Sequence, residues 1–241
     1  MESMKILYVF PHPDDESFGP AAAISQQRRH DHEVFLLTLT KGGATKERFK
    51  YGYSVEQMGR VRYGEMQEVA KVLTLSDLTV LDFPDSGLKE LDPRELERAV
   101  KEHIQQVAPD VVITYPVHGI SGFHDHLVTH HVVKRVFLEL RTTGRPKRLA
   151  FFTITEDRAA QAKHHELNFS SGQDIDCVVS LDQQDIDVLE QSLQCYKTYQ
   201  DMIEKTGVKD ITADTAHFEI FQENYDPPVS DLFLGLEQIC I

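Results

Sequence analysis

Five stretches of the chain are almost continuously apolar, and segments with helical spacing separate them. The apolar runs occupy residues 5–10, 33–40, 78–83, 110–115 and 148–154. Runs of this kind are typical of strands that are buried on both faces of a parallel sheet. In the intervening segments the apolar residues recur every three or four positions, which predicts helices over 17–29, 54–73, 92–107 and 125–140.

This alternation of strand and helix predicts an α/β fold, a Rossmann-like and mostly parallel sheet with helices on both faces. A helix is predicted over 182–204 and a strand over 217–223. We expect these last elements to form a C-terminal extension that closes over one end of the sheet. Because no linker, repeat or low-complexity tract divides the chain, residues 1–241 are expected to form a single domain.

Two clusters of histidine and acidic residues each follow one of these predicted strands. The first is PHPDDE at 11–16, and the second is HGISGFHDH at 118–126. Ligands of open α/β sheets bind beyond the carboxyl ends of the strands, and parallel strands end at the same edge. We therefore expect the two clusters to lie close together, although they are about a hundred residues apart in the sequence.

The residue types in the two clusters are those of a metal site. His12 and Asp15 lie three residues apart at a strand-to-helix turn, and a third ligand from 118–126 would complete a His/Asp/His set. Nitrogen and carboxylate ligands with water in the remaining position are typical of catalytic zinc. The cation would also offset the adjacent acids at 14–16. Asp14, beside the metal, could then accept a proton from the water, as amide or ester hydrolysis requires.

The first cluster has a plainer interpretation as well. Acidic residues are favourable at a helix N-terminus, and Ser17 could cap a helix that begins there. The presence of His12 and of the second cluster favours the metal site over this alternative.

PHPDDE after a hydrophobic strand, followed later by an Asp-His pair, resembles the LmbE/PIG-L family of zinc-dependent de-N-acetylases. Residues 59–73, 81–88 and 195–200 are also similar to segments of that family. The resemblance implies a deacetylase that hydrolyses the amide of an N-acetylglucosamine-type sugar conjugate, or of a similar small polar amide. It implies one Zn²⁺ per chain and a small-molecule N-acetylated substrate. Relatives often form homo-oligomers.

Carried over by position, the resemblance assigns roles to five residues. His12, Asp15 and His126 become the zinc ligands, and Asp14 becomes the general base. Asp125 becomes a residue behind the ligands that orients a histidine.

The sequence departs from the family pattern immediately before His126. The family reads G-H-P-D-H, and its first histidine stabilises the oxyanion, whereas this chain reads GFHDH at 122–126 with Phe123 in that position. We predict that His124 takes over this catalytic role by a shift of one residue. His118 or a backbone N–H is the alternative.

Further residues are candidates for contact with the substrate. Lys41 begins a basic, glycine-rich stretch over 41–53, which is either a solvated loop or a lid over the site. Arg60 is the predicted basic contact to the substrate, whereas Arg62 and Glu65 are expected to form a surface pair. Asp85 follows the third strand and either binds sugar hydroxyls or belongs to an ordinary turn.

His130 lies four residues after His126, so both can occupy one helix face. We expect His130 to line the pocket or to lie behind the ligands, with metal ligation as the alternative.

Composition limits which classes of partner the chain can bind and indicates the cellular compartment. The chain carries 25 Lys and Arg against 39 Asp and Glu, a net charge of −14, which argues against nucleic acid and against an anionic membrane surface. No run approaches the length of a membrane span, and no secretion signal is recognised. The three cysteines are far apart, so a reducing, cytoplasmic location is predicted.

Other functions remain as alternatives. The same metal site could serve an esterase, or a phosphoester hydrolase with Mn²⁺ or a second metal. Phe123 allows a catalytically impaired relative that still binds metal. A nucleotide-binding module is disfavoured, because no G-x-G-x-x-G follows the first strand.

Overall fold

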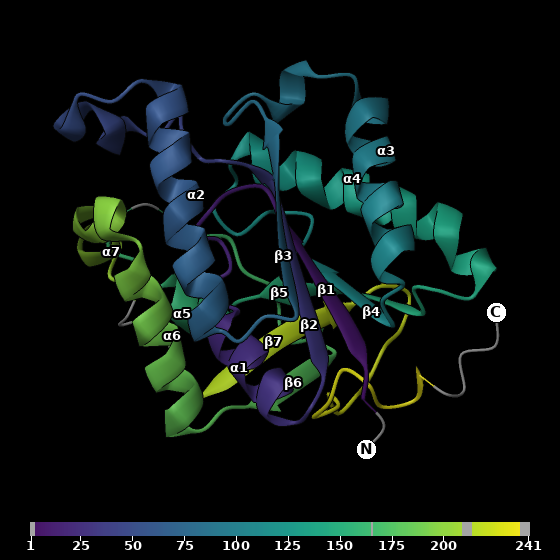
Figure 1. Ribbon diagram of the computed structural model, residues 1–241. Coiled ribbons are helices and arrows are strands. Elements are labelled where there is room, and N and C mark those ends of the chain that lie inside the picture. The colour runs from purple at the N-terminus through teal and green to yellow at the C-terminus, as the bar shows by residue number, and fades with distance from the viewer. Residues whose placement is uncertain (1–2, 165, 209–213, 237–241) are drawn as a thin grey trace.

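A seven-stranded sheet runs through the described part of the chain, residues 3–164, 166–208 and 214–236 of a computed structural model (Figure 1). Its strand order is β3-β2-β1-β4-β5-β7-β6. The first five strands pair in parallel, whereas β7 is antiparallel to both β5 and β6. The strands are β1 Lys5–Phe10, β2 Glu33–Thr40, β3 Asp77–Phe83, β4 Val111–Thr114, β5 Arg148–Thr153, β6 Cys177–Ser180 and β7 Thr215–Ile220.

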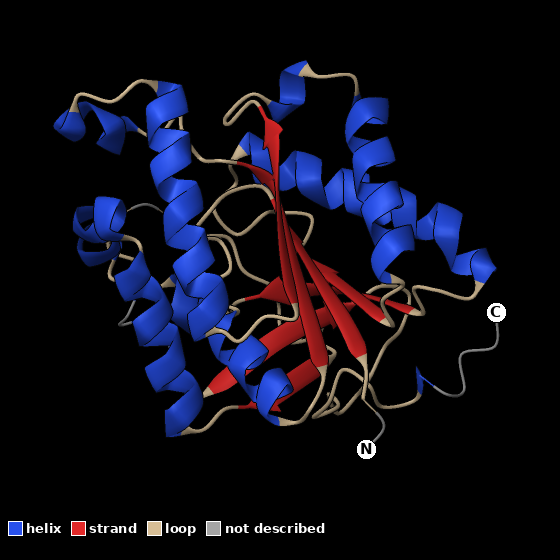
Figure 2. Cartoon of the chain, viewed as in Figure 1, coloured by secondary structure: helices blue, strands red, loops and turns tan. Residues whose placement is uncertain are grey.

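Helices cover both faces of this sheet (Figure 2). α1, α2 and α6 pack on one face, and α3 and α4 pack on the other. The α-helices are α1 Ala21–Arg29, α2 Val55–Val72, α3 Pro93–Val107, α4 His124–Leu140, α5 Glu156–Ala159, α6 Gln183–Cys195 and α7 Gln200–Thr206. The short 3₁₀ helices are η1 Lys46–Tyr51, η2 Leu88–Glu90, η3 Arg141–Thr143 and η4 Lys197–Tyr199.

β1 is apolar throughout because both of its faces are buried. Its even-numbered residues, such as Tyr8, pack toward α1, whereas Leu7 and Val9 pack toward α3 and α4. Side chains that alternate between two buried layers produce a continuous apolar run rather than an alternating one. The same pattern in β2, β4 and β5 made these strands recognisable in the sequence.

The order of the strands places the two His/Asp clusters side by side. β1 pairs with β2 on one side and with β4 on the other. Such a position, where the strand order reverses, opens a crevice at the carboxyl edge of the sheet. The turn after β1 and the loop after β4 both begin at this crevice.

The predicted fold class is confirmed, and the C-terminal part is the main difference. We expected an extension that covers one end of the sheet. Instead β6 and β7 extend the sheet itself, and α6 packs against α1 and α2. The helix predicted over 182–204 is interrupted after Cys195, where Tyr196 is fully buried.

The first helix begins later than predicted. α1 starts at Ala21, and Ser17 does not cap it but donates a hydrogen bond to Glu16 Oε1 at 2.7 Å. The reason lies in Asp14, whose φ of 92° breaks the helical path and makes 11–20 a series of turns.

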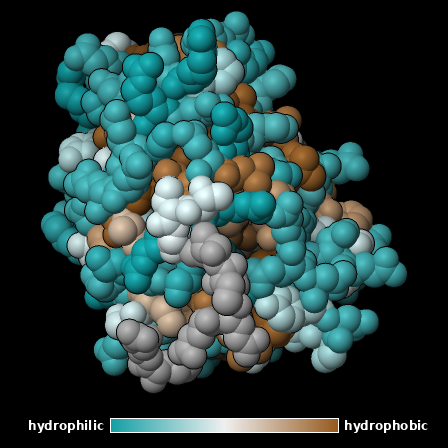
Figure 3. All heavy atoms as spheres, turned by 90° about the vertical axis from the view of Figure 1, so that its right-hand side faces the viewer, coloured by the Kyte–Doolittle hydropathy of each residue, from teal (hydrophilic) through white to brown (hydrophobic). Residues whose placement is uncertain are grey.

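The surface is largely polar on the side that carries α3. Figure 3 shows this side as mostly hydrophilic, with hydrophobic residues in small groups. In the described residues, no helix combines the length and apolar character that a bilayer span requires.

Candidate metal centre and active site

The turn after β1 presents its polar side chains to the crevice. The His12 backbone N–H donates to Asp15 Oδ2 at 2.8 Å, and the Ser17 and Phe18 N–H groups donate to the Asp14 carbonyl at 2.8 Å. These bonds fix the turn around Asp14, which has the positive φ. His12, Asp14 and Asp15 consequently all line one cavity of about 480 Å³.

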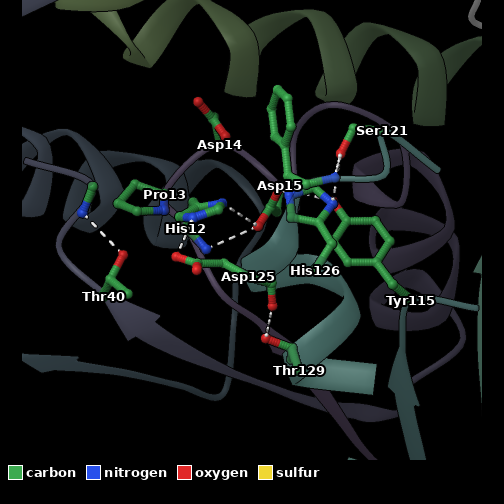
Figure 4. A network of polar contacts seen from close by, with 12 residues as sticks. His12, Pro13, Asp14, Asp15, Thr40, Tyr115, Ser121, Asp125, His126 and Thr129 are labelled. Carbon is green, nitrogen blue, oxygen red and sulfur yellow. Dashed lines mark hydrogen bonds and ion pairs between the residues drawn. The ribbon is translucent and has the colours of Figure 1, made fainter. Parts of the chain in front are cut away.

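Three side chains, two from the turn after β1 and one from the first turn of α4, converge in this cavity (Figure 4). Asp15 Oδ1 lies 3.3 Å from His126 Nε2, and Asp15 Oδ2 lies 3.6 Å from His12 Nδ1. One ligand atom from each residue lies within 4.8 Å of the others. Two histidines and a carboxylate in this arrangement can hold a single divalent cation.

Neighbouring groups on the side away from the cavity fix the orientation of these three side chains. His126 Nδ1 lies 2.9 Å from the Gly119 carbonyl, which can only accept, so Nδ1 carries the proton and Nε2 keeps its lone pair. The Tyr115 ring stacks on His126 at 4.2 Å between centroids, and its hydroxyl donates to Asp15 Oδ1 at 2.7 Å.

Asp125 orients the other histidine in the same way. Its Oδ2 lies 3.2 Å from His12 Nε2, which leaves His12 Nδ1 directed toward Asp15. Asp125 also accepts hydrogen bonds from the Ser86 N–H at 2.8 Å and the Leu88 N–H at 3.2 Å. A carboxylate behind a histidine is a recurrent feature of metal centres.

The electrostatics of the cavity favour a cation. Burial alone would lower the pKa of His12, but Asp125, Asp15 and Asp85 outweigh it and raise this pKa to about 9. Burial alone would likewise raise the pKa of Asp15, yet the neighbouring His126 lowers it overall. The carboxylates therefore favour positive charge at the point where the three side chains meet. Two imidazole nitrogens and one carboxylate oxygen at this point suit a divalent cation.

Asp14 lies to one side of these three residues (Figure 4). Its Oδ2 accepts a hydrogen bond from Arg62 Nη2 at 2.6 Å, and the Arg62 side chain is only 3% exposed. Burial raises the pKa of the Asp14 carboxyl, while the Arg62 cation opposes that rise. A carboxylate held in this way is suited to accept a proton from a water molecule in the cavity.

Tyr196, which directly follows α6, supports the turn after β1. The Asp14 N–H donates to the Tyr196 hydroxyl at 2.8 Å, and that hydroxyl donates to Glu16 Oε1 at 2.6 Å. Glu16 is completely buried, and this burial raises its pKa to about 7. Glu16 and Tyr196 thus hold the backbone of Asp14 in its strained conformation.

The structure brings most of the predicted site residues together. His12, Asp14, Asp15, Asp85 and His126 all line the cavity. Asp85 Oδ1 lies 3.4 Å from His12 Nε2, and its Oδ2 accepts from the Ala44 N–H at 2.6 Å.

His130 lies behind the cavity rather than in it. Its Nδ1 lies 2.9 Å from the Tyr115 carbonyl, and burial lowers its pKa to about 4. It belongs to neither group of described residues whose ligand atoms lie close enough to share an ion.

Two predicted substrate contacts, Arg60 and Lys41, lie elsewhere. Arg60 pairs with Glu56 on the surface at 2.5 Å, with 62% of its side chain exposed, and Lys41 pairs with Asp82 at 3.1 Å. Neither borders the cavity. Arg60 lies on the outer side of α2, because the side that carries Arg62 faces the core.

The structure does not place His124, the predicted oxyanion residue, at the cavity. His124 is the exposed first residue of α4, and Phe123 borders the cavity in its place. His118, the alternative, contacts Ser170 Oγ at 3.2 Å and lies outside the cavity lining.

Arg62, Tyr115 and Tyr196 contribute to the site although no sequence pattern had been assigned to them there. Arg62 was expected to pair with Glu65 on the surface, but Glu65 is buried and accepts from the Thr198 N–H and hydroxyl. A signal was present, because Arg62 lies four residues from each of two core methionines, Met58 and Met66, on the buried face of α2. No comparable pattern marked the two tyrosines.

Comparison with known proteins connects this geometry to a family. The family model of PIG-L, GlcNAc-PI de-N-acetylase, matches residues 7–137, more than half of the chain. The matched segment contains the turn after β1 and His126. The 1D-myo-inositol 2-acetamido-2-deoxy-alpha-D-glucopyranoside deacetylase of Thermomonospora curvata is 30% identical over 152 residues, covering 54% of this chain and 51% of that enzyme. The chain thus spans about half the length of this curated relative.

Solved structures share the fold at lower identity. A teicoplanin deacetylase, in its zinc-inhibited form, has a TM-score of 0.71 at 13% identity, covering 90% of this chain and 97% of that one. The 4-carboxy-2-hydroxymuconate hydratase of Pseudomonas putida has a TM-score of 0.68 at 14% identity, covering 92% and 97%. Because a hydratase shares the fold, the reaction must be argued from the site.

Proposed function

This chain belongs to the PIG-L family of GlcNAc-PI de-N-acetylases, and from that premise we propose that it is a zinc-dependent hydrolase of N-acylated sugar conjugates. It would remove the acyl group from the amide nitrogen of an N-acetylglucosamine-type substrate. The observation that carries the proposal is the convergence of His12, Asp15 and His126 in one cavity beside Asp14. The name of the Thermomonospora curvata relative, a deacetylase of a 2-acetamido sugar, supports the substrate class.

His12, Asp15 and His126 would hold the zinc ion. When bound, zinc would supply Lewis acidity, which makes water a better nucleophile at neutral pH and polarises an acyl oxygen. The residues behind these three keep the donor atoms directed inward. Asp125 does this for His12, and the Gly119 carbonyl does it for His126.

Asp14 would move the proton. Its carboxylate accepts a proton from the attacking water as the water oxygen bonds to the acyl carbon. It then delivers that proton to the amide nitrogen as the C–N bond breaks, which yields a free amine and a carboxylic acid. Arg62 holds one oxygen of Asp14 in place throughout.

A panel of N-acetylglucosamine conjugates, incubated with zinc-loaded protein, tests this function. Release of free amine is the readout, and matched O-acetyl esters are included. We expect amine release from the amides, and a loss of about 10²–10⁴-fold in turnover for Asp14→Asn with unchanged zinc content.

Asp82→Asn is the matched control, because Asp82 has 80% of its side chain exposed on β3 and should leave turnover unchanged. Equal amine release by Asp14→Asn would remove Asp14 from the mechanism. Release of alcohol from the esters without amine from the amides would favour the esterase alternative.

A further inference from the structure

The cavity extends from the metal-binding residues into the interior of the protein. Its inner walls come from α1, β5, α6 and α7, and most of their contributions are apolar. Ala22, Phe152 and Leu189 are each at most 4% exposed, so they form a deep part of the cavity rather than its entrance. We call this part the apolar arm and define it by Phe18, Ala22, Phe152, Leu181, Leu189 and Met202.

The entrance of the cavity is different in chemistry. Lys46 and Ser86 line it and are exposed, and Asp85 lies next to them with partial exposure. These side chains offer charged and hydroxyl groups close to His12. The cavity therefore has a mostly polar mouth, where Phe123 is an exposed apolar residue, and a mostly apolar interior. His12, Asp15 and His126 lie between the two.

Close packing on α1 shapes the inner wall. A Cβ at Gly19 would lie 2.4 Å from Cε1 of Phe152, so only glycine allows this ring to sit against the start of the helix. Ala22, one turn further along α1, also has a small side chain. Besides Arg62, the lining includes a second buried cation, Arg158. Its Nη2 donates to the Thr215 carbonyl and hydroxyl at 2.5 and 2.8 Å, at the start of β7.

The two ends of the cavity suit the two halves of an N-acylated sugar. A sugar carries several hydroxyl groups, and burying them without hydrogen-bond partners in an apolar cavity is costly. An alkyl chain has no such groups and gains free energy when it leaves water. The sugar therefore fits the polar mouth, and the acyl group fits the apolar arm.

We propose that the apolar arm binds the acyl chain, and that the preferred substrate carries an acyl group of several carbons rather than acetyl. This inference rests on the proposed function, because it assigns the two sides of the amide bond that the site would cleave. The whole cavity, mouth included, measures about 480 Å³, and the six residues that define the arm line a larger surface than an acetyl methyl group can contact.

A series of N-acyl glucosamines tests the inference. The acetyl, butanoyl, hexanoyl, octanoyl and decanoyl compounds are compared by kcat/KM with the zinc-loaded protein. Burial of each methylene should raise kcat/KM by about fourfold until the arm is full. A steady fall in kcat/KM from acetyl to the longer chains would overturn the inference.

Variants that fill the arm provide the second test. Met202 is half-buried on α7 and lines the arm, so Met202→Trp should lower the octanoyl-to-acetyl ratio of kcat/KM about tenfold or more. Glu204→Trp is the matched control, because Glu204 is exposed on the same helix and does not line the cavity. If Met202→Trp fails to fold, Ala22→Met fills the arm from α1. An unchanged ratio in a folded variant would contradict the inference.

Calorimetry on the metal-free protein separates this inference from the proposed function. The inference predicts that N-octanoylglucosamine binds at least tenfold more tightly than N-acetylglucosamine, without any turnover. If no compound releases glucosamine but this difference is seen, the proposed function fails and the apolar arm stands. If glucosamine is released without any effect of chain length on rate or binding, the inference alone fails.

Discussion

Asp14 is the residue at which backbone strain and buried charge coincide. Its φ of 92° is unusual for any residue other than glycine and costs about 1–3 kcal/mol. The conformation persists because its N–H bonds to Tyr196 and its carbonyl accepts from Ser17 and Phe18. The strain directs the carboxylate toward Arg62, away from Asp15. Such strain is characteristic of functional sites, and here it separates the proposed base from the proposed metal ligands.

The pair of Arg62 and Asp14 yields a prediction about stability. Arg62→Met removes the cation and leaves a buried carboxylate, which should lower the free energy of unfolding by about 3–5 kcal/mol. Arg62→Met combined with Asp14→Asn should be more stable than Arg62→Met alone, since the remaining side chain is neutral. Urea denaturation of the four proteins measures this cycle.

Arg60→Met is the matched control for that cycle, because Arg60 lies on the same helix and pairs only on the surface. Its unfolding free energy should change by less than about 0.5 kcal/mol. Strict additivity of the Arg62 and Asp14 substitutions would show that the pair does not interact.

At the scale of elements, the start of α1 determines how the turn after β1 meets β5. Gly19 lies against the Phe152 ring, and Pro20 follows at the position before the helix. Because this contact joins α1 to β5, it also fixes the wall of the apolar arm. Side chains larger than hydrogen at this position must displace the ring or the helix.

Two glycine substitutions should therefore have opposite effects. Gly19→Ala should lower the unfolding free energy by about 1–3 kcal/mol, because its Cβ would overlap the Phe152 ring. Gly64→Ala, in the middle of α2 with nothing within 4 Å of the added Cβ, should raise it by about 0.5–1 kcal/mol. Denaturation midpoints of both variants check the pair, and destabilisation by Gly64→Ala would count against this packing account.

At the scale of the whole molecule, the site is assembled from four distant segments. His12 and Asp15 follow β1, His126 lies in the first turn of α4, Arg62 comes from α2, and Tyr196 follows α6. A cation bound by two of these segments would oppose unfolding of both, because the unfolded chain has no preformed site. Metal binding should therefore be visible in the stability of the entire fold.

Zinc at about 100 times its Kd should add about 2.7 kcal/mol to the unfolding free energy. For a chain of this size, that corresponds to a rise of roughly 5–10 °C in Tm, which a chelator should reverse. Differential scanning calorimetry with and without zinc makes the measurement.

His12→Ala should lose the zinc response of Tm, whereas His131→Ala, an exposed residue on α4, should retain it. An equal zinc response in His12→Ala would exclude His12 as a ligand.

More of the fold than of the site could be predicted from the sequence. The five strands from β1 to β5 were found because strands buried on both faces leave a continuous apolar signal. β6 was missed, since four residues at the edge of a sheet leave too short a pattern. The interruption after Cys195 was missed because Tyr196 turns inward to reach Glu16, a contact between residues 180 positions apart.

The amino-acid sequence alone determined the parallel core, the two clusters at its carboxyl edge and the family likeness, because these depend on local periodicity and on residues adjacent in the chain. Only the tertiary structure decided that Arg62 and not Arg60 meets Asp14, that His124 faces solvent, and that the cavity continues into an apolar arm. Those features depend on contacts between distant segments, which no local pattern encodes. For Arg62 the spacing to Met58 and Met66 indicated the buried face of α2, but not the contact with Asp14.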